Sequence, residues 1–439
     1  MIALSIDETH RRVVEAVLSL EGAEEVPLRE ARGRVSCRDV RAAGDQPRFD
    51  SSAMDGWAVN GSGDGGYRIV GESRAGRAFG RVLGEGEAIH ISTGAKIPAG
   101  AAAIVRRENG RVAAGVLIAQ GVAPGRDMRL RGCDFRRGDP LLHAGRRLDH
   151  FDIARLAASG LDRLHVNSVP RVALLATGNE IVRPGRTAPA EGNYDALSFA
   201  LWARLTQLGV TVTDLGSAED SDAAIRERAV SAGADILIVI GGASGGRHDR
   251  ARAAFAPHGL EVMVPAVRMK PGKPFWFGRY DGRRLVAGLP GNPVAALAAL
   301  ELFIVPALLA VQGRPAAFRW EPCAAPAQGV PGGAERVRFA RRGATGTEVI
   351  DCDDSAALSP LAGADALCRI GPDGARSADL LMHETGPAPS CQAARVENEM
   401  KTFPLHDRVN ETFLPVAARY GAGTINHQAG SVYEMLFIK

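Results

Sequence analysis

Lysine is scarce in this sequence of 439 residues. Five lysines, at positions 96, 270, 273, 401 and 439, accompany 48 arginines. An ammonium group is a compact point charge, whereas a guanidinium is a planar fork of donors, so a retained lysine suggests a role that arginine does not fill. Two of the five lie three residues apart in Lys270-Pro-Gly-Lys273. This pair is a candidate for an anion-binding loop; the alternative is a solvated turn.

An excess of charge of one sign is also lacking. The 53 basic and 50 acidic residues leave a formal net charge of +3 and no basic domain, which argues against nucleic acid as a partner. The longest apolar stretch, residues 294–311, contains Glu301 and Pro306. A buried helix is therefore favoured there over a membrane span, and no membrane partner is expected.

The marks of a secreted or zinc-binding protein are missing as well. The first twenty residues read as an amphipathic helix carrying acidic side chains, rather than as a signal peptide. None of the six cysteines are spaced as CxxC, so a zinc knuckle is unsupported. Scattered thiols without a signal peptide predict a reducing, cytoplasmic location.

Residues 169–315, with residues 1–19, predict an α/β domain. Apolar runs such as residues 171–176 and 235–240 alternate with amphipathic segments such as residues 221–232. Such alternation predicts a parallel sheet covered by helices on both faces, and therefore three layers.

The rest of the chain predicts β structure. Residues 42–139 are glycine-rich with short β-type runs, which indicates a mixed β domain, and residues 316–383 indicate a C-terminal β domain. Segments 20–41 and 140–168 flank the first β domain and are expected to pack together as a linking domain. Residues 384–439 differ in composition and form an atypical tail, which we expect to be dispensable.

Three glycine-rich turns follow strands of the predicted α/β domain. They are Thr177-Gly-Asn-Glu180, Gly241-Gly-Ala-Ser-Gly-Gly246 and Gly288-Leu-Pro-Gly-Asn292. The carboxyl ends of parallel strands share one edge of a sheet, where glycine lets backbone N–H groups approach an anion. One such turn alone more often only reverses the chain, but three near the lysine pair predict an anion site. The turns match neither a Walker A loop nor a GxGxxG fingerprint, which argues against an ordinary NTPase or dehydrogenase.

Several carboxylates occur in the same regions of the sequence. They suit Mg²⁺, which prefers oxygen ligands and bridges substrate phosphates. The candidates are Asp55, Asp134, Glu180, Asp220 and Asp249. For a lone acid the safer interpretation is a solvated surface residue. Asp249 is the exception, because it directly follows the glycine-rich loop.

Together these motifs resemble the MoeA family, the molybdopterin molybdenumtransferases, whose eukaryotic relatives include the gephyrin E domain. The matching segments occur in family order over residues 1 to about 383 and are specific as a set. They are Asp50-Ser-Ser-Ala-Met-Asp-Gly56, Ser92-Thr-Gly-Ala-Lys-Ile-Pro-Ala-Gly100, Arg129-Leu-Arg-Gly-Cys-Asp134, Ala176-Thr-Gly-Asn-Glu180, residues 241–249, Met269-Lys-Pro-Gly-Lys-Pro274 and Gly288-Leu-Pro-Gly-Asn-Pro-Val294.

The resemblance implies an elongated homodimer of four-domain subunits. A three-layer α/β molybdopterin-binding domain would be joined to a mixed β domain and a C-terminal β-barrel-like domain. The site would lie between the α/β domain of one subunit and the β domain of the other. The implied reaction depends on Mg²⁺: adenylylated molybdopterin and molybdate give the molybdenum cofactor and AMP.

The resemblance also implies roles for individual residues. The implied catalytic residues are Asp249, Glu180, Asp55 and Ser244. The implied metal ligands are Glu180, Asp220 and Asp249. The implied molybdate ligands are Lys270, Lys273, Arg341 and Ser355. The remaining substrate contacts fall to Thr93, Asp134, Asp220, Gly241, Gly242 and Asn292.

Three departures from the family pattern remove acids. The family's GVSVGDYD stretch has Arg247 in place of an aspartate here, and Asn179 and Cys133 stand where acids are usual. These losses would weaken metal binding or mark a paralogue. Two other functions stay open. A molybdopterin adenylyltransferase would share the α/β domain but would not need the two β domains, and a non-catalytic molybdopterin-binding scaffold is favoured by the altered glycine loop. Expected partners are a second copy of the chain, a molybdopterin adenylyltransferase and molybdoenzyme maturation factors.

Overall fold

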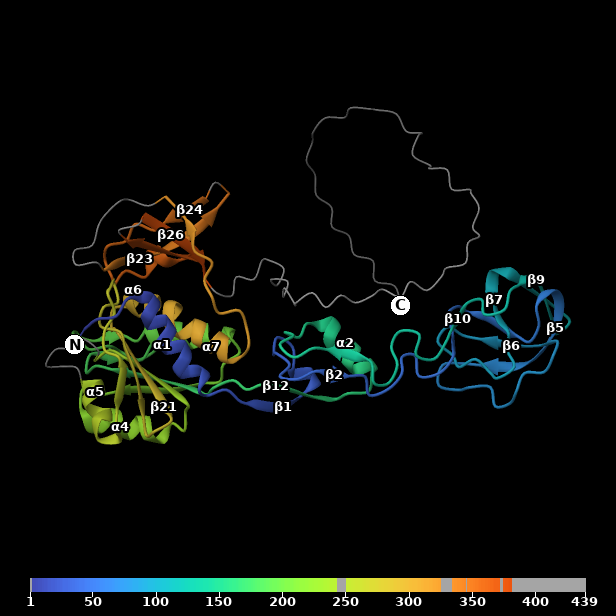
Figure 1. Cartoon of the computed structure of the whole chain (residues 1–439), viewed down its shortest axis with the longest axis horizontal. Helices are drawn as coiled ribbons and strands as arrows, with labels where there is room; N and C mark the ends of the chain where they lie inside the picture. The colour runs from blue at the N-terminus through green and yellow to red at the C-terminus, as the bar shows by residue number, and fades with distance from the viewer. Residues whose placement is uncertain (1, 243–249, 325–333, 345, 372–373, 381–439) are drawn as a thin grey trace, which may run out of the picture. The chain divides into compact units, whose positions relative to one another are not determined.

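The computed structural model describes residues 2–242, 250–324, 334–344, 346–371 and 374–380 (Figure 1). Ser244 and Asp249, two of the expected site residues, lie outside the described residues. The atypical tail, residues 384–439, lies outside them as well. The structure has several domains of α/β and of β type, as predicted.

The α/β domain is built on a six-stranded sheet with strand order β16-β13-β17-β21-β20-β18. Its strands are β13 (Val172–Thr177), β16 (Val212–Ala218), β17 (Ile236–Ile240), β18 (Glu261–Val264), β20 (Trp276–Tyr280) and β21 (Arg284–Leu289). Five of the six strands run in one direction, and β20 alone runs antiparallel to its neighbours β21 and β18. The prediction of a fully parallel sheet is wrong at this edge, because a tight turn at Asp281 joins β20 to β21 without a crossover helix.

Helices cover both faces of this sheet in three layers (Figure 1). Side chains alternate along each strand, so Leu174 and Leu175 of β13 enter different cores. The core around Leu174 includes α1 (Ile6–Leu18), α3 (Leu197–Gln207), α6 (Pro293–Ala299) and α7 (Val305–Val311). The core around Leu175 includes α4 (Asp222–Ser231) and α5 (Arg250–Phe255).

The longest apolar stretch forms a continuous helical segment, Pro293–Val311, in which α6 and α7 are joined by η4 (Leu300–Ile304). By length and composition it could cross a membrane, but 89% of its most apolar window is buried inside the protein. The buried Glu301 within it pairs with the mostly enclosed Arg204 of α3 at 2.6 Å. It is therefore a core helix, as the sequence predicted.

The mixed β domain contains a six-stranded sheet with order β7-β4-β6-β5-β9-β8. Its strands are β4 (Gly56–Val59), β5 (Gly63–Ser73), β6 (Glu87–Ile91), β7 (Ala103–Arg106), β8 (Gly110–Ala113) and β9 (Val116–Val122). A short ribbon of β3 (Ser51–Ser52) and β10 (Met128–Arg129) lies beside the segment that carries Asp55. Trp57 and Ile89 belong to separate cores on the two faces of the sheet.

The two segments that flank this domain pair with one another. β1 (Ala23–Pro27) is antiparallel to β12 (Arg163–Asn167), and β2 (Val40–Arg41) is antiparallel to β11 (Pro140–Leu142). Between β11 and β12 lies α2 (His150–Ala158), which begins at a capping box formed by Asp149 and Asp152. Leu28, Leu156 and Val166 belong to the small hydrophobic core that these two segments share.

The C-terminal sheet follows the path β19-β23-β25-β26-β22, with β24 paired to β23. Its strands are β19 (Met269–Lys270), β22 (Glu321–Pro322), β23 (Glu335–Gly343), β24 (Gly346–Val349), β25 (Ala366–Gly371) and β26 (Gly374–Asp379). Over the described residues this path is open between β19 and β22, so closure into a barrel stays a prediction. β19 comes from the α/β part of the chain and places Lys270 beside this sheet.

Candidate functional site

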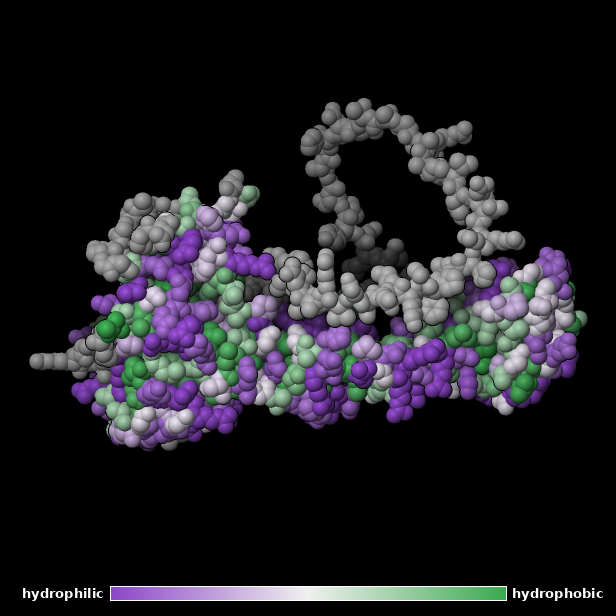
Figure 2. Space-filling view, viewed as in Figure 1, coloured by the Kyte–Doolittle hydropathy of each residue, from purple (hydrophilic) through white to green (hydrophobic). Residues whose placement is uncertain are grey.

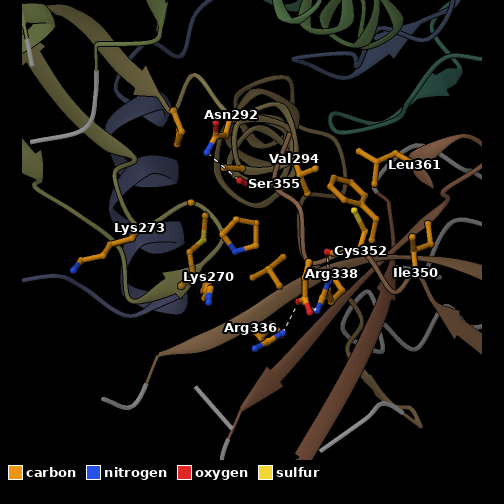
Figure 3. Close-up of a pocket in the computed structure, with 18 of the residues that line it drawn as sticks. Lys270, Lys273, Asn292, Val294, Arg336, Arg338, Ile350, Cys352, Ser355 and Leu361 are labelled. Atoms are coloured by element: carbon orange, nitrogen blue, oxygen red, sulfur yellow. Dashed lines mark hydrogen bonds and ion pairs between the residues drawn. The ribbon is translucent and has the colours of Figure 1, made fainter. Parts of the chain in front are cut away.

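A cationic pocket of about 280 Å³ lies where the loop of Lys270 and Lys273 meets the C-terminal sheet (Figure 3). β19 pairs in parallel with β23, and in this register Lys270 lies opposite Arg336. Arg338 lies two residues further along β23 and therefore faces the same side. Four cationic residues line the pocket, namely Lys270, Lys273, Arg336 and Arg338. The side chain of Lys273 points away from the other three (Figure 3).

The two arginines are mostly enclosed by the protein. The side chain of Arg336 is 14% exposed and that of Arg338 is 9% exposed. Each donates to the carboxylate of Asp353, with Nη1 of Arg336 at 2.9 Å. The buried Nε–H of Arg336, however, has no hydrogen-bond partner among the described residues. An unpaired buried N–H costs free energy, which an anionic acceptor would recover.

Asn292 and Ser355 form the neutral wall of this pocket (Figure 3). The sequence predicts Asn292 as the N-cap of the helix that begins at Pro293, and it does occupy that position. Its side chain does not cap the helix, however, but donates through Nδ2 to Oγ of Ser355 at 2.9 Å. The backbone N–H of Val294 also donates to the carbonyl of Ser355, at 2.9 Å. The start of α6 thereby fixes Ser355 at the edge of the cationic pocket.

A second pocket, of about 680 Å³, adjoins the first. Its lining includes Gly178 after β13, Gly241 and Gly242 after β17, and Gly291 after β21. These strands are parallel, so the three predicted glycine turns do lie at one edge of the sheet. The two pockets share three lining residues, which are Pro274, Pro290 and Asn292.

Two of the expected carboxylates, Glu180 and Asp220, also line this second pocket. The backbone N–H of Asp220 donates to Oδ1 of Asn179 at 3.2 Å, which ties the turn after β13 to the loop after β16. Asn179, where the resemblance implies an acid, thus connects the two carboxylate-bearing segments. Within the described ranges, no group of three or more His, Cys, Asp and Glu side chains is arranged to hold a metal ion.

The backbone conformation of Gly241 allows the packing of the turn after β17 at this edge of the sheet to be tested. Its φ is +89°, and a Cβ there would meet the carbonyl oxygen of Thr177 at 2.7 Å. We expect Gly241→Ala to lower the free energy of unfolding by about 2–4 kcal/mol, because both left-handed strain and a backbone clash oppose it. The measurement is urea denaturation with Gly185→Ala as control, since Gly185 has a φ of +86° but open space around its Cβ. Equal losses in both variants would contradict the clash.

Comparison with known proteins decides the family. Residues 4–160 match the MoeA N-terminal region (domain I and II), and residues 173–310 match the probable molybdopterin binding domain. The chain is 35% identical over 332 residues to molybdopterin molybdenumtransferase 2 of Mycobacterium tuberculosis, which covers 71% of this chain and 81% of that protein. This chain belongs to the molybdopterin molybdenumtransferase family.

Two further comparisons agree with this membership. The molybdopterin molybdenumtransferase of Haemophilus influenzae is 30% identical over 318 residues, covering 71% of this chain and 78% of that protein. The crystal structure of the molybdopterin biosynthesis MoeA protein from Pyrococcus horikosii superposes with a TM-score of 0.69 at 27% identity, covering 86% of this chain and 99% of that one. The prediction of a transferase in molybdenum-cofactor biosynthesis is confirmed.

The structure places Arg341, one of the expected molybdate ligands, outside the cationic pocket. Its guanidinium donates to the carbonyls of Pro360 and Ala362 at 2.7 and 2.9 Å, and it does not line the cationic pocket. Along β23, Arg341 is an odd number of residues from Arg338, so its side chain leaves the opposite face of the strand. Arg336 and Arg338, which the sequence reasoning missed, line the cationic pocket instead. Their signal was the alternating Arg-Val-Arg at the start of that strand.

The expected residues of the mixed β domain form a small group of their own. The Oδ1 atom of Asp55 accepts hydrogen bonds from the backbone N–H and the hydroxyl of Thr93, at 2.6 and 2.9 Å. These bonds, the backbone one first, hold the pKa of Asp55 below its usual value. Asp134 is exposed, and its backbone N–H donates to the carbonyl of Gln46 at 3.0 Å. Among the described residues that line the two pockets, none belongs to residues 42–139.

Proposed function

We propose that this protein inserts molybdate into adenylylated molybdopterin and releases AMP, in a reaction that requires Mg²⁺. The observation that carries the proposal is the pair of adjoining pockets. One pocket is cationic and suits an oxyanion. The other is lined by glycine turns, whose backbone N–H groups suit the phosphates of a larger ligand. Asn292 belongs to both pockets, so the two ligands would meet there.

Molybdate would bind in the cationic pocket. It is a dianion, and charge-assisted hydrogen bonds from ammonium and guanidinium groups are the strongest that a protein offers it. Lys270 and Lys273 would supply point charges, and the guanidinium of Arg336 would supply N–H donors. The hydroxyl of Ser355, held by Asn292, would complete the set. Arg336 thus takes the role that the resemblance assigned to Arg341.

Adenylylated molybdopterin would bind along the glycine turns. Backbone N–H groups of the turns at Gly178, Gly241 and Gly242 would approach its phosphates. Glu180 and Asp220, with Asp249 from the loop after β17, would hold Mg²⁺, and their oxygen donors fit that ion. A bound Mg²⁺ would neutralise charge on the phosphoanhydride oxygens.

The proposed reaction balances without an oxidant. Water adds to a phosphorus of the phosphoanhydride, the bridging P–O bond breaks, and AMP leaves. The two dithiolene sulfurs bind molybdenum and give their protons to an oxo group, which departs as water. The chemistry of the dithiolene belongs to the cofactor, and the protein orients the two substrates. Asp249 would orient the attacking water, and Glu180 and Ser244 would assist it.

Assembly as a homodimer is part of the same proposal. Asp55, Thr93 and Asp134 would serve the site of a second copy, which is consistent with pockets that take no described lining residue from residues 42–139. A cytoplasmic location is also proposed, because the five cysteines among the described residues carry no disulfide. A molybdopterin adenylyltransferase would supply the substrate, and maturation factors of molybdoenzymes would receive the product.

Release of AMP from adenylylated molybdopterin tests this function, and Asp249→Asn tests the main catalytic assignment. The variant keeps the side-chain volume and removes the charge. We expect it to lower AMP release by at least about a hundredfold while the substrate still binds, since positioned general bases contribute about 10²–10⁴ in rate. Glu191→Gln, an exposed carboxylate of the same domain, is the control. Normal turnover by Asp249→Asn would show that the assignment is wrong and would favour the scaffold.

A further inference from the structure

The cationic pocket already contains an anion of the protein's own. Oδ1 of Asp353 accepts a hydrogen bond from Nη1 of Arg336 at 2.9 Å and another from Nη2 of Arg338 (Figure 3). Asp353 lines the same pocket as Lys270 and Ser355. A carboxylate therefore occupies the donors that an oxyanion would need.

The three members of this cluster differ greatly in burial. The side chains of Arg336 and Arg338 are 14% and 9% exposed, whereas that of Asp353 is 73% exposed. Arg338 has a second anchor, because it also donates to the carbonyl of Cys352. Arg338 is thus anchored apart from Asp353, and Arg336 is held by its burial, while the carboxylate reaches both from the solvent side.

The backbone that carries Asp353 is held by bonds that do not involve the Asp353 side chain, the contact of Arg338 with Cys352 among them. The backbone N–H of Ala356 donates to Oδ1 of Asp354 at 2.9 Å, and the thiol of Cys352 donates to the carbonyl of Asp354 at 3.2 Å. The loop can therefore keep its place when the Asp353 side chain turns toward water. Leaving would require only a side-chain rotation, and an exposed carboxylate is readily hydrated.

We propose that Asp353 is an internal competitor for the oxyanion site: it pairs with Arg336 and Arg338 when the pocket is empty and must be displaced before molybdate can bind. The inference rests on the proposed function, since it assumes that molybdate is the oxyanion. A dianion gains more than a single carboxylate from fixed cations, because Coulomb energy scales with charge. Molybdate can therefore displace Asp353, but its affinity for the site is lower than Lys270, Arg336 and Arg338 alone would give.

The charge state of Asp353 agrees with this role. Its hydrogen bond to Arg338, followed by the charge of the same arginine, holds the pKa of the Asp353 carboxyl below its usual value. Arg336 and Lys270 add smaller contributions in the same direction. The carboxylate is consequently ionised at neutral pH and competes as an anion.

The test is the affinity for molybdate of Asp353→Asn, measured by calorimetry on the full chain. Asparagine keeps the shape and removes the competing charge, so we expect binding to become roughly three- to fivefold tighter. Sulfate, another dianion, should tighten by a similar factor, because the cost of vacating the site does not depend on the incoming anion. Asp351→Asn is the matched control: Asp351 lies 3.9 Å from Nη2 of Arg338 with its side chain 91% exposed, and its loss should change affinity less than twofold.

The outcomes separate the inference from the function on which it rests. If the wild-type protein binds molybdate and Asp353→Asn binds it with the same affinity, only the proposed competition is overturned. Weaker binding would also overturn it, and would show that Asp353 positions the arginines for the oxyanion. Failure of the wild-type protein itself to bind molybdate would overturn the proposed function together with the inference.

Discussion

Alanine at both Lys270 and Lys273 is expected to weaken molybdate binding by at least about a hundredfold. Each lysine is proposed to make a charge-assisted contact of about 1.5–3 kcal/mol, so Lys273→Ala alone should lose about ten- to a hundredfold. Both side chains are exposed, so the fold should be nearly unaffected. Titration calorimetry with molybdate measures the loss.

Lys96→Ala is the control for this experiment. Lys96 is also an exposed lysine, but it lies in the mixed β domain and lines neither pocket. Its replacement should leave the affinity for molybdate unchanged. Wild-type affinity in the double variant would show that the lysine pair is the solvated turn that the sequence left open.

Arg369→Ala is expected to lower the free energy of unfolding by about 3 kcal/mol. The side chain of Arg369 is 3% exposed, and it pairs with Glu335 and with Asp7 of α1, each at 2.6 Å. It also stacks on Trp320 at 5.2 Å from the ring centroid. Removing one member of a buried ion pair leaves the other uncompensated, here Glu335, whose side chain is 18% exposed.

Urea denaturation of Arg369→Ala measures this loss. Arg342→Ala is the control in the same sheet, because its partner Asp379 is 61% exposed and such pairs contribute about 1 kcal/mol or less. We expect the Arg369 variant to unfold at clearly lower urea than the control. Equal stability of the two variants would mean that the link between α1 and the C-terminal sheet does not stabilise the protein.

The α/β domain could be predicted in outline because its signals are local. Apolar runs such as residues 235–240 and the glycines that follow them mark strand ends, and parallel strands bring those ends to one edge. The hairpin of β20 and β21 was missed, since strand direction depends on the length of the turn between strands rather than on their composition.

Only the lysines of the cationic pocket could be predicted from the sequence, and its arginines could not. The lysine pair stands out in a chain dominated by arginine, but no local feature says which arginine of β23 faces it. That choice depends on the register between β19 and β23, two strands about sixty residues apart in sequence, and a shift of one residue reverses every side chain. For the same reason the contact of Asn292 with Ser355 and the pairing of Asp353 could not be read from the sequence.

The most direct test of the proposed function counts molybdenum and AMP in the same reaction. Purified protein is given adenylylated molybdopterin, Mg²⁺ and molybdate, and both released AMP and pterin-bound molybdenum are measured over time. The proposal predicts that the two appear together in equal amounts and that chelation of Mg²⁺ stops both. AMP release without molybdenum incorporation, or substrate that stays bound and unreacted, would contradict it.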